Sequence, residues 1–172
     1  MKTAIVILSV MLALSSACQT SVATKQIDLD EGEGIAIEQL EGGVVVAGTQ
    51  AIDLGRLVYI YLVQNHYEAR RVIIDAKTAQ VIDVRDKTDV LATAVENGNG
   101  LETSIIPLHR EAAEAAALET APGYIRKWQA KKEDGRFVFV FKVRNGIDKE
   151  TRVTVDGFSY QILDQSEEGL LD

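Results

Sequence analysis

Two stretches of the chain share one pattern: Val72-Ile73-Ile74-Asp75-Ala76-Lys77-Thr78-Ala79-Gln80-Val81-Ile82-Asp83 and Val153-Thr154-Val155-Asp156-Gly157-Phe158-Ser159-Tyr160-Gln161-Ile162-Leu163-Asp164. Each reads as an apolar strand, an aspartate, a polar turn, a glutamine, two aliphatic residues and a second aspartate. Asp75 and Asp156 lie 81 positions apart. A repeat at this period predicts two small modules of one design, so that any function has to be argued for a pair of modules.

The repeat continues on both sides of these stretches. At an offset of 80, Gly43 is matched by Gly123, Gly55-Arg56 by Gly135-Arg136, and Val63 by Val143. A helical pattern opens each copy, at 28–40 and 110–120, and β-prone runs follow it. In the first copy these runs are a strand that starts with 44–46, followed by 57–63, 68–75 and 80–84. In the second copy they are 124–132, 137–143, 151–156 and 161–163. We therefore expect an α+β fold of two modules, each with one helix packed on a small antiparallel sheet.

The domain organisation follows from these patterns. Module one is expected at 27–86 and module two at 104–165. The linker, 87–103, contains the turn-forming run Asn97-Gly98-Asn99-Gly100, and residues 90–95 within it form a short helix or strand. Residues 18–26 are a polar tether, and residues 166–172 are an acidic tail with no clear structure.

Residues 1–17 are typical of a signal peptide, with Lys2, an apolar run from Ala4 to Leu14 and small residues after it. The run is too short for a transmembrane helix, which needs about 20 apolar residues. Leu14-Ser15-Ser16-Ala17-Cys18 resembles the lipobox of bacterial lipoproteins, in which the cysteine is lipidated. Ser15 stands where that motif prefers an aliphatic residue, so ordinary signal cleavage stays open. We expect a location in the periplasm or outer cell envelope, with a membrane anchor if Cys18 is acylated.

Composition excludes two classes of protein. The formal net charge of −8 argues against nucleic-acid binding, which needs a basic face toward the phosphates. Cys18 is the single cysteine, so the chain is not a disulfide scaffold. A hydrophobic content of 47% is enough for a core, and the aromatic content of 6% means that aliphatic residues fill most of it.

One helix followed by a meander that ends in an aspartate, a turn and an aliphatic pair is similar to the PepSY domain. That family has a glycine after its helix, a Tyr-rich central strand and a last hairpin of the form V-D-x-x-T-G-x-V. The matching positions are Gly43, Tyr59, Tyr61 and 74–81 in the first copy, and Gly123, Phe139, Phe141 and 155–162 in the second. Ala79 and Tyr160 replace the turn glycine of the family, so the turn is expected to differ in type.

Few residues stand out as a functional site. We find no catalytic set, metal-ligand spacing or cofactor motif, and we predict no cofactor. Asp75 and Asp156 are expected to form turns by accepting local backbone N–H bonds. Tyr59, Tyr61 and Trp128 are candidate anchors for a partner, since aromatic residues are frequent at interfaces; the other interpretation is that they form the core.

The PepSY resemblance implies a non-catalytic role, because such modules occur as inhibitory propeptides of secreted peptidases and in bacterial envelope proteins. We expect an exported, non-enzymatic binding module whose partner is a protein, with an envelope peptidase as the first class to consider. An exposed sheet edge would let a partner chain add as a strand. The alternative is a structural or sensory accessory lipoprotein of an envelope complex.

Overall fold

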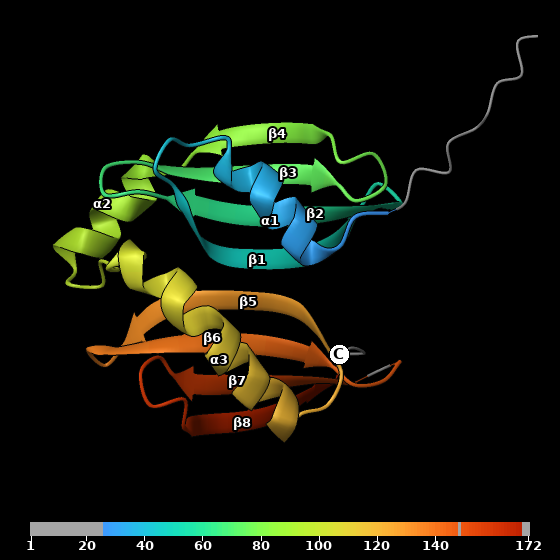
Figure 1. Cartoon of the computed structure of the whole chain (residues 1–172), viewed down its shortest axis with the longest axis vertical. Helices are drawn as coiled ribbons and strands as arrows, with labels where there is room; N and C mark the ends of the chain where they lie inside the picture. The colour runs from blue at the N-terminus through green and yellow to red at the C-terminus, as the bar shows by residue number, and fades with distance from the viewer. Residues whose placement is uncertain (1–25, 148, 170–172) are drawn as a thin grey trace, which may run out of the picture.

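The computed structural model describes residues 26–147 and 149–169. The expected α+β class is confirmed, with helices and an antiparallel sheet (Figure 1). The helices are α1 (Leu29–Ile37), α2 (Thr88–Glu96), the short 3-10 helix η1 (Thr103–Ile105) and α3 (Ile106–Thr120). The strands of module one are β1 (Val44–Asp53), β2 (Arg56–Gln64), β3 (Ala69–Asp75) and β4 (Val81–Asp86). Those of module two are β5 (Tyr124–Glu133), β6 (Arg136–Arg144), β7 (Lys149–Asp156) and β8 (Ile162–Gly169).

The two modules share one sheet, which corrects the expectation of a separate small sheet in each. Its eight strands run in the order β4-β3-β2-β1-β5-β6-β7-β8, and every neighbouring pair is antiparallel. The seam is the pairing of β1 with β5 through Ala47 and Gln129, Gly48 and Trp128, and Thr49 and Lys127. Each small sheet would otherwise leave β1 or β5 as an open edge, and pairing the two satisfies their backbone groups.

The central pair of the seam explains how two copies of one design fit together. Gly48 and Trp128 are counterparts in the repeat, 80 positions apart, and they face each other across the seam. An approximate two-fold axis therefore passes between them. A Cβ atom on Gly48 would lie 2.8 Å from Nε1 of Trp128, so the indole fits because its counterpart has no side chain.

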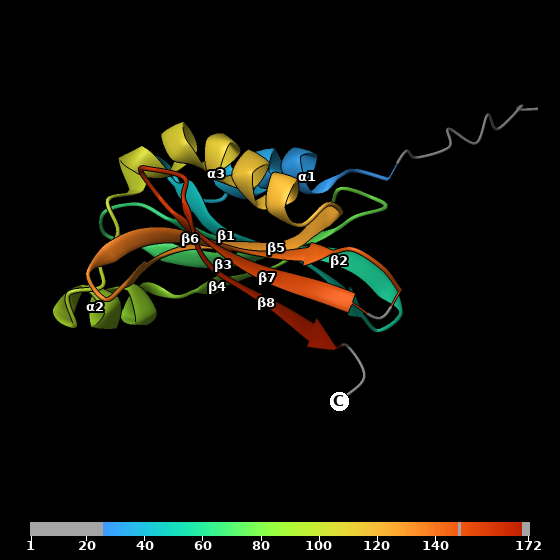
Figure 2. The same cartoon turned by 90° about the horizontal axis from the view of Figure 1, so that it is seen from below.

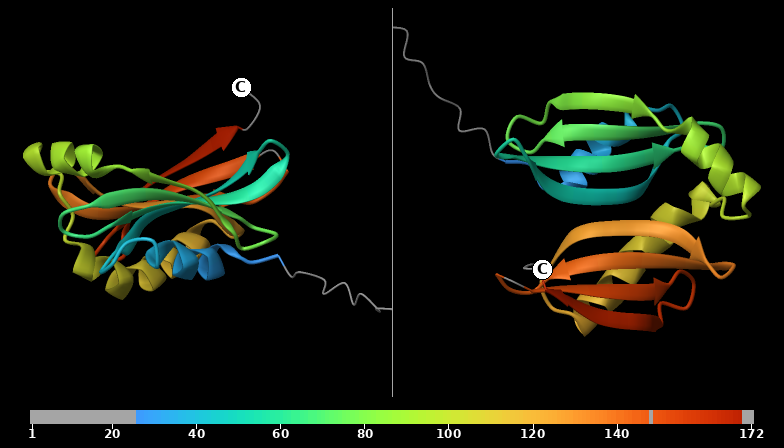
Figure 3. Two further views of the ribbon diagram at one scale, coloured as in Figure 1. Left: turned by 90° about the horizontal axis from the view of Figure 1, so that it is seen from above. Right: turned by 180° about the vertical axis from the view of Figure 1, so that it is seen from behind.

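The helices divide between the two faces of the sheet. α1 and α3 lie side by side on one face, and α2 lies on the opposite face at one end (Figures 2 and 3). Small residues let α1 and α3 approach the sheet: Gly32 and Ala36 of α1, and Ala113 and Ala117 of α3, are buried. The core lies under these helices. We call the other face the uncovered face, since α2 covers it at one end only. Fully buried core residues include Tyr61, Val63, Val72, Trp128, Phe139, Phe141 and Val153.

Local signals set the start of α1. Asp28 is its N-cap, with Oδ1 accepting the N–H of Glu31 at 2.8 Å, and the Glu31 carboxylate accepts the N–H of Asp28 at 3.0 Å. This reciprocal capping box satisfies two N–H groups that the helix itself cannot. The helix ends at Ile37, three residues before the expected position 40, whereas α3 begins at Ile106, four residues before the expected position 110. Pro107 suits that start, because the first turn needs no N–H there.

Regular structure also forms in the expected linker and acidic tail. Helix α2 occupies residues 88–96 of the linker, which decides between the helix and strand left open for 90–95. The expectation of no clear structure after residue 165 is wrong, because β8 pairs with β7 as far as Gly169 opposite Lys149. Backbone pairing needs no apolar side chains, and charged residues are common on such edge strands. Residues 170–172 lie outside the described range.

Candidate functional site

Asp75 and Asp156 hold equivalent turns. Asp75 Oδ1 accepts the N–H groups of Lys77 and Thr78, both at 2.9 Å. Asp156 Oδ1 accepts the corresponding N–H groups of Phe158 and Ser159, at 3.1 and 2.9 Å. These backbone hydrogen bonds lower the pKa of both carboxyl groups. Both aspartates therefore shape the hairpins, each through one carboxylate oxygen that accepts two backbone N–H groups.

The two turns keep the conformation that a glycine would favour. Ala79 and Tyr160 both have a φ of +59°, in the left-handed region. The expectation of a different turn type is therefore wrong, and each module carries the strain of a side chain at this φ. In module two the Tyr160 hydroxyl lies 2.7 Å from Nδ1 of His109, which ties this turn to α3.

The three aromatic candidates lie in the core. Tyr59 is 4% exposed, and Tyr61 and Trp128 are 0% exposed. The hydroxyl groups of Tyr59 and Tyr61 donate to the carbonyl oxygens of Ile27 and Leu29, at 3.0 and 2.6 Å, and so hold the start of α1. Since a partner cannot reach side chains buried in this way, the structure supports the core interpretation that the sequence had left open.

The candidate lipidation residue, Cys18, lies outside the described residues, as does the signal peptide at 1–17. Within 26–147 and 149–169, no helix has the length and apolar character needed to cross a bilayer.

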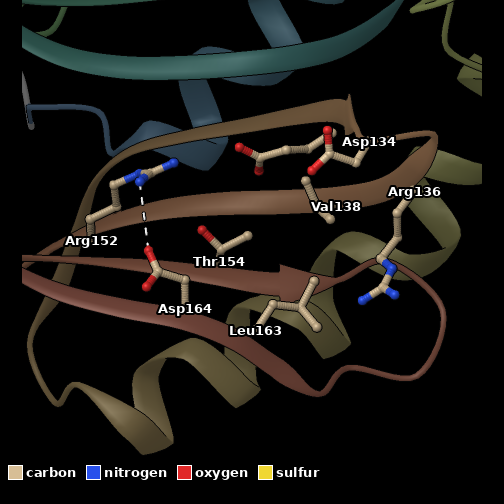
Figure 4. A pocket seen from close by; sticks show the side chains of 8 residues that line it. Asp134, Arg136, Val138, Arg152, Thr154, Leu163 and Asp164 are labelled. Atoms are coloured by element: carbon tan, nitrogen blue, oxygen red, sulfur yellow. Dashed lines mark ion pairs between the residues drawn. The ribbon is translucent and has the colours of Figure 1, made fainter.

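The uncovered face carries a pocket that the sequence did not indicate (Figure 4). It has a volume of about 420 Å³ and lies over β6, β7 and β8. We call it the hairpin pocket; its lining residues are Glu133, Asp134, Arg136, Val138, Arg152, Thr154, Leu163 and Asp164. The strand alternation of β7 places Arg152, Thr154 and Asp156 on this face, because every second side chain points the same way.

The two arginines of the hairpin pocket are only loosely paired with carboxylates. Arg152 approaches Asp164 at 3.7 Å and Arg136 approaches Asp156 at 3.8 Å. Both distances lie beyond hydrogen-bond range. A guanidinium group has five N–H donors and suits planar acceptors such as carboxylates. Within the described residues these two side chains therefore offer their donors to a further acceptor.

Thr154 adds a buried polar group to this pocket. The residue is 4% exposed, and its hydroxyl has no hydrogen-bond partner among the described residues. It lies between the Arg152–Asp164 pair and the side chains of Val138 and Leu163 (Figure 4). A buried hydroxyl without a partner costs about 1 to 3 kcal/mol. At the equivalent position module one has Ile73, so the fold itself accepts an apolar residue there.

The repeat contained a signal for this pocket. Arg136, Arg152 and Asp164 correspond to Arg56, Arg71 and Asp83 of module one. The charged lining thus recurs between two copies that share few identities, and mapping it onto the strand alternation would have placed it on one face. Together the arginines and the hydroxyl can bind a carboxylate or another acceptor, while Glu133 and Asp134 favour a nearby positive charge.

Neither a protein-family model nor a curated protein matches this chain. In fold it is similar to the crystal structure of a candidate lipoprotein from Clostridium difficile 630, with a TM-score of 0.50. The sequences are 16% identical, and the superposition covers 83% of this chain and 94% of the other. At this identity the likeness shows the fold alone.

Proposed function

We propose that this protein is a non-catalytic binding protein of the bacterial envelope that recognises a protein partner through the uncovered face of module two. The hairpin pocket carries the proposal. Its unpartnered hydroxyl at Thr154 and its loosely paired arginines, Arg136 and Arg152, are groups that a partner's polar side chains or backbone would satisfy.

The sequence supports the place where this binding occurs. The signal-peptide pattern of residues 1–17 directs the chain to the periplasm or outer envelope. Cys18 lies in a lipobox-like context, and the structure of similar fold belongs to a candidate lipoprotein. Lipidation at Cys18 would hold the binding face close to a membrane surface.

An envelope peptidase is the first partner class to test, and regulation of that enzyme is the proposed outcome. The PepSY-like order of helix, strands and closing hairpin in both modules supports this choice. The edge strands β4 and β8 support it as well, since each has one side without a partner strand in the sheet. A peptidase loop could pair with such an edge while its side chains enter the hairpin pocket.

The test is capture of envelope proteins on the immobilised mature chain, followed by peptidase assays on what is captured. Arg152→Gln removes one donor group of the pocket, and Arg71→Gln is the matched control at the equivalent position of module one. We expect the wild-type chain and Arg71→Gln to retain the same partner and Arg152→Gln to lose it. The proposal is wrong if no partner is captured and no peptidase changes its activity, and the pocket assignment is wrong if both variants behave alike.

A structural or sensory accessory lipoprotein is the second candidate, favoured by the lipobox-like position of Cys18. In that role the protein would join an envelope complex without acting on a peptidase. Cell fractionation of Cys18→Ser tests the anchor: we expect release from the membrane fraction. Unchanged membrane association would contradict lipid anchoring at this residue.

A further inference from the structure

A second pocket lies on the uncovered face beneath α2, and we call it the α2 pocket. Its volume is about 240 Å³. Strands β1, β2, β3 and β5 form its floor, so both modules contribute to it. Its apolar walls include Val46, Leu62, Ala69, Leu91, Ala94 and Leu101. This volume lies below the range of about 300 to 1,000 Å³ of drug-sized sites, which favours a single narrow chain as occupant.

The helix above the pocket is held in place but poorly packed. At its start, the N–H of Lys87 donates to the carbonyl of Ala69 at 2.8 Å. At its end, the N–H of Asn99 donates to the carbonyl of Ala94 at 2.7 Å, which closes the last turn of the helix. Nevertheless no residue of α2 is buried. The apolar side chains of its inner surface border open space, and an apolar ligand would remove that surface from water.

The charge around the pocket is positive, in contrast to the chain as a whole. Lys87, Lys131 and Lys132 line it, and no aspartate or glutamate does. Lys131 pairs with Glu133 at 3.2 Å, whereas Lys87 has no carboxylate within 4.0 Å among the described residues. In a chain of net charge −8, an apolar pocket with a lysine rim is complementary to an amphipathic anion.

Strand pairing at this place argues against a peptide as the occupant. Each of β1, β2, β3 and β5 has a partner strand on both sides, so the floor offers no free strand edge. A peptide entering the pocket would bury amide groups that need hydrogen-bond partners. An aliphatic chain carries no such groups, and its apolar surface matches the walls.

Module two shows that the apolar character of the pocket is not demanded by the fold. Val46, Leu62 and Ala69 correspond to Arg126, Lys142 and Glu150 in the repeat. There the same positions carry a closed set of ion pairs, with Glu150 between Arg126 and Lys142. Within residues 26–147 and 149–169, only module one has apolar side chains at these positions, and only there does a helix, α2, border them.

We propose that the α2 pocket binds a free fatty-acid-type carboxylate, with the aliphatic chain between α2 and the sheet and the carboxylate at the lysine rim. This activity goes beyond the proposed partner binding, since it uses other residues and another part of the uncovered face. The hairpin pocket, with its charged lining, offers no comparable apolar floor.

Calorimetric titration of the mature chain tests the proposal, with Cys18→Ser present in every protein so that no acyl group of its own is attached. Hexanoate, octanoate and decanoate are the probes. We expect affinity to rise about two- to fourfold for each added methylene, because each one buries further apolar surface. Decyltrimethylammonium has a tail of the same length and the opposite charge, and we expect it to bind at least about tenfold more weakly than decanoate.

Matched variants locate the site. Ala94→Leu fills the pocket and is expected to abolish decanoate binding, whereas Ala92→Leu, at an exposed position of the same helix, leaves it unchanged. Lys87→Gln should weaken binding about threefold, and the exposed Lys149→Gln should have no effect. Equal binding of the anion and the cation, or full binding by Ala94→Leu with its fold intact by circular dichroism, would overturn the proposal. Binding of N-acetyl-leucine as tight as that of octanoate would also overturn it, in favour of a peptide terminus.

Discussion

The same place on the uncovered face is ionic in module two and apolar in module one. In module two, the Glu150 side chain is 1% exposed, with its carboxylate accepting from Arg126 and lying 3.3 Å from Lys142. Its counterpart Ala69 in module one lines the α2 pocket. One backbone design thus supports either a cluster of ion pairs or an apolar pocket. The repeat determines where the strands lie, and single side chains determine what each face can bind.

A second contrast lies in the core, where the two modules fill one space in different ways. Module two has Phe137 and Gly157 where module one has Leu57 and Ala76. The backbone contact is the same in both: the N–H of Gly157 donates to the carbonyl of Phe137 at 2.9 Å, and that of Ala76 donates to Leu57 at 3.1 Å. A larger ring in one strand is therefore offset by the loss of a methyl group in its neighbour.

The largest expected effect comes from breaking this compensation. In Gly157→Ala the new Cβ would lie 2.1 Å from Cδ1 of Phe137, so the buried ring has to move. We expect a loss of about 3 kcal/mol in the free energy of unfolding, measured by urea denaturation. Adding Phe137→Leu recreates the pair of module one and should restore most of the loss. Simple additivity of the two changes would mean that the residues do not compensate for each other.

The next effect concerns the ion cluster. Glu150→Gln leaves Arg126 and Lys142 without their central carboxylate, and we expect the free energy of unfolding to fall by about 2 kcal/mol. This loss is smaller than that for a fully buried ion pair, because both cations are partly exposed. Hydrogen bonds from Arg126 lower the pKa of Glu150 below its ordinary value of 4.5. Its contribution is therefore full above pH 4.5 and is lost as the pH falls through the lowered folded-state pKa.

Unfolding curves at a series of pH values check this prediction. The difference between the wild-type chain and Glu150→Gln should shrink as the solution is acidified. Glu167→Gln is the control, since this exposed residue pairs with Lys149 only at 3.7 Å. A difference that stays constant with pH would show that the loss comes from packing and not from charge.

A smaller effect tests how the two modules hold their helices. Tyr61 donates to the carbonyl of Leu29 at 2.6 Å, whereas its counterpart Phe141 has no hydroxyl. Tyr61→Phe should cost about 1 kcal/mol of unfolding free energy, through the lost hydrogen bond at the start of α1. Tyr67→Phe, at a side chain that is 78% exposed, should change nothing. Equal effects of the two changes would show that the Tyr61 hydroxyl does not stabilise the fold.

The smallest effect has the opposite sign. Thr154→Val removes a buried hydroxyl that has no hydrogen-bond partner among the described residues. We expect the free energy of unfolding, measured by thermal or urea denaturation, to rise by up to about 1 kcal/mol. Thr151→Val on the same strand is the contrast, because Thr151 Oγ1 accepts from Asn145 Nδ2 at 3.0 Å, and its loss should destabilise. Destabilisation by both changes would indicate that Thr154 is satisfied in solution.

Much of the local structure could be predicted from the sequence. The short-range signals are glycines at equivalent positions, β-prone runs between turns and the paired aspartates of the closing hairpins. Strands β2 to β7 begin and end within two residues of the predicted runs, and β1 begins at the predicted residue 44. The helix ends were less predictable, because α3 begins at Ile106 without a side-chain cap and its first turn carries Pro107 as the local start signal. The strand after residue 163 was missed since its acidic side chains give no apolar alternation, and β7 supplies the pairing.

The α+β class and the aspartate turns can be read from the sequence, because each depends on residues that are close along the chain, and the repeat of these short segments indicates two modules. The packing in three dimensions, in contrast, shows that the modules share one sheet, that Tyr59, Tyr61 and Trp128 are core residues, and where the two pockets lie. These features join residues that are distant in sequence, so no local pattern of residues indicates them. Whether the edge of β1 is open or paired, and whether a strand face is covered, depends on how the two copies and their helices pack in three dimensions.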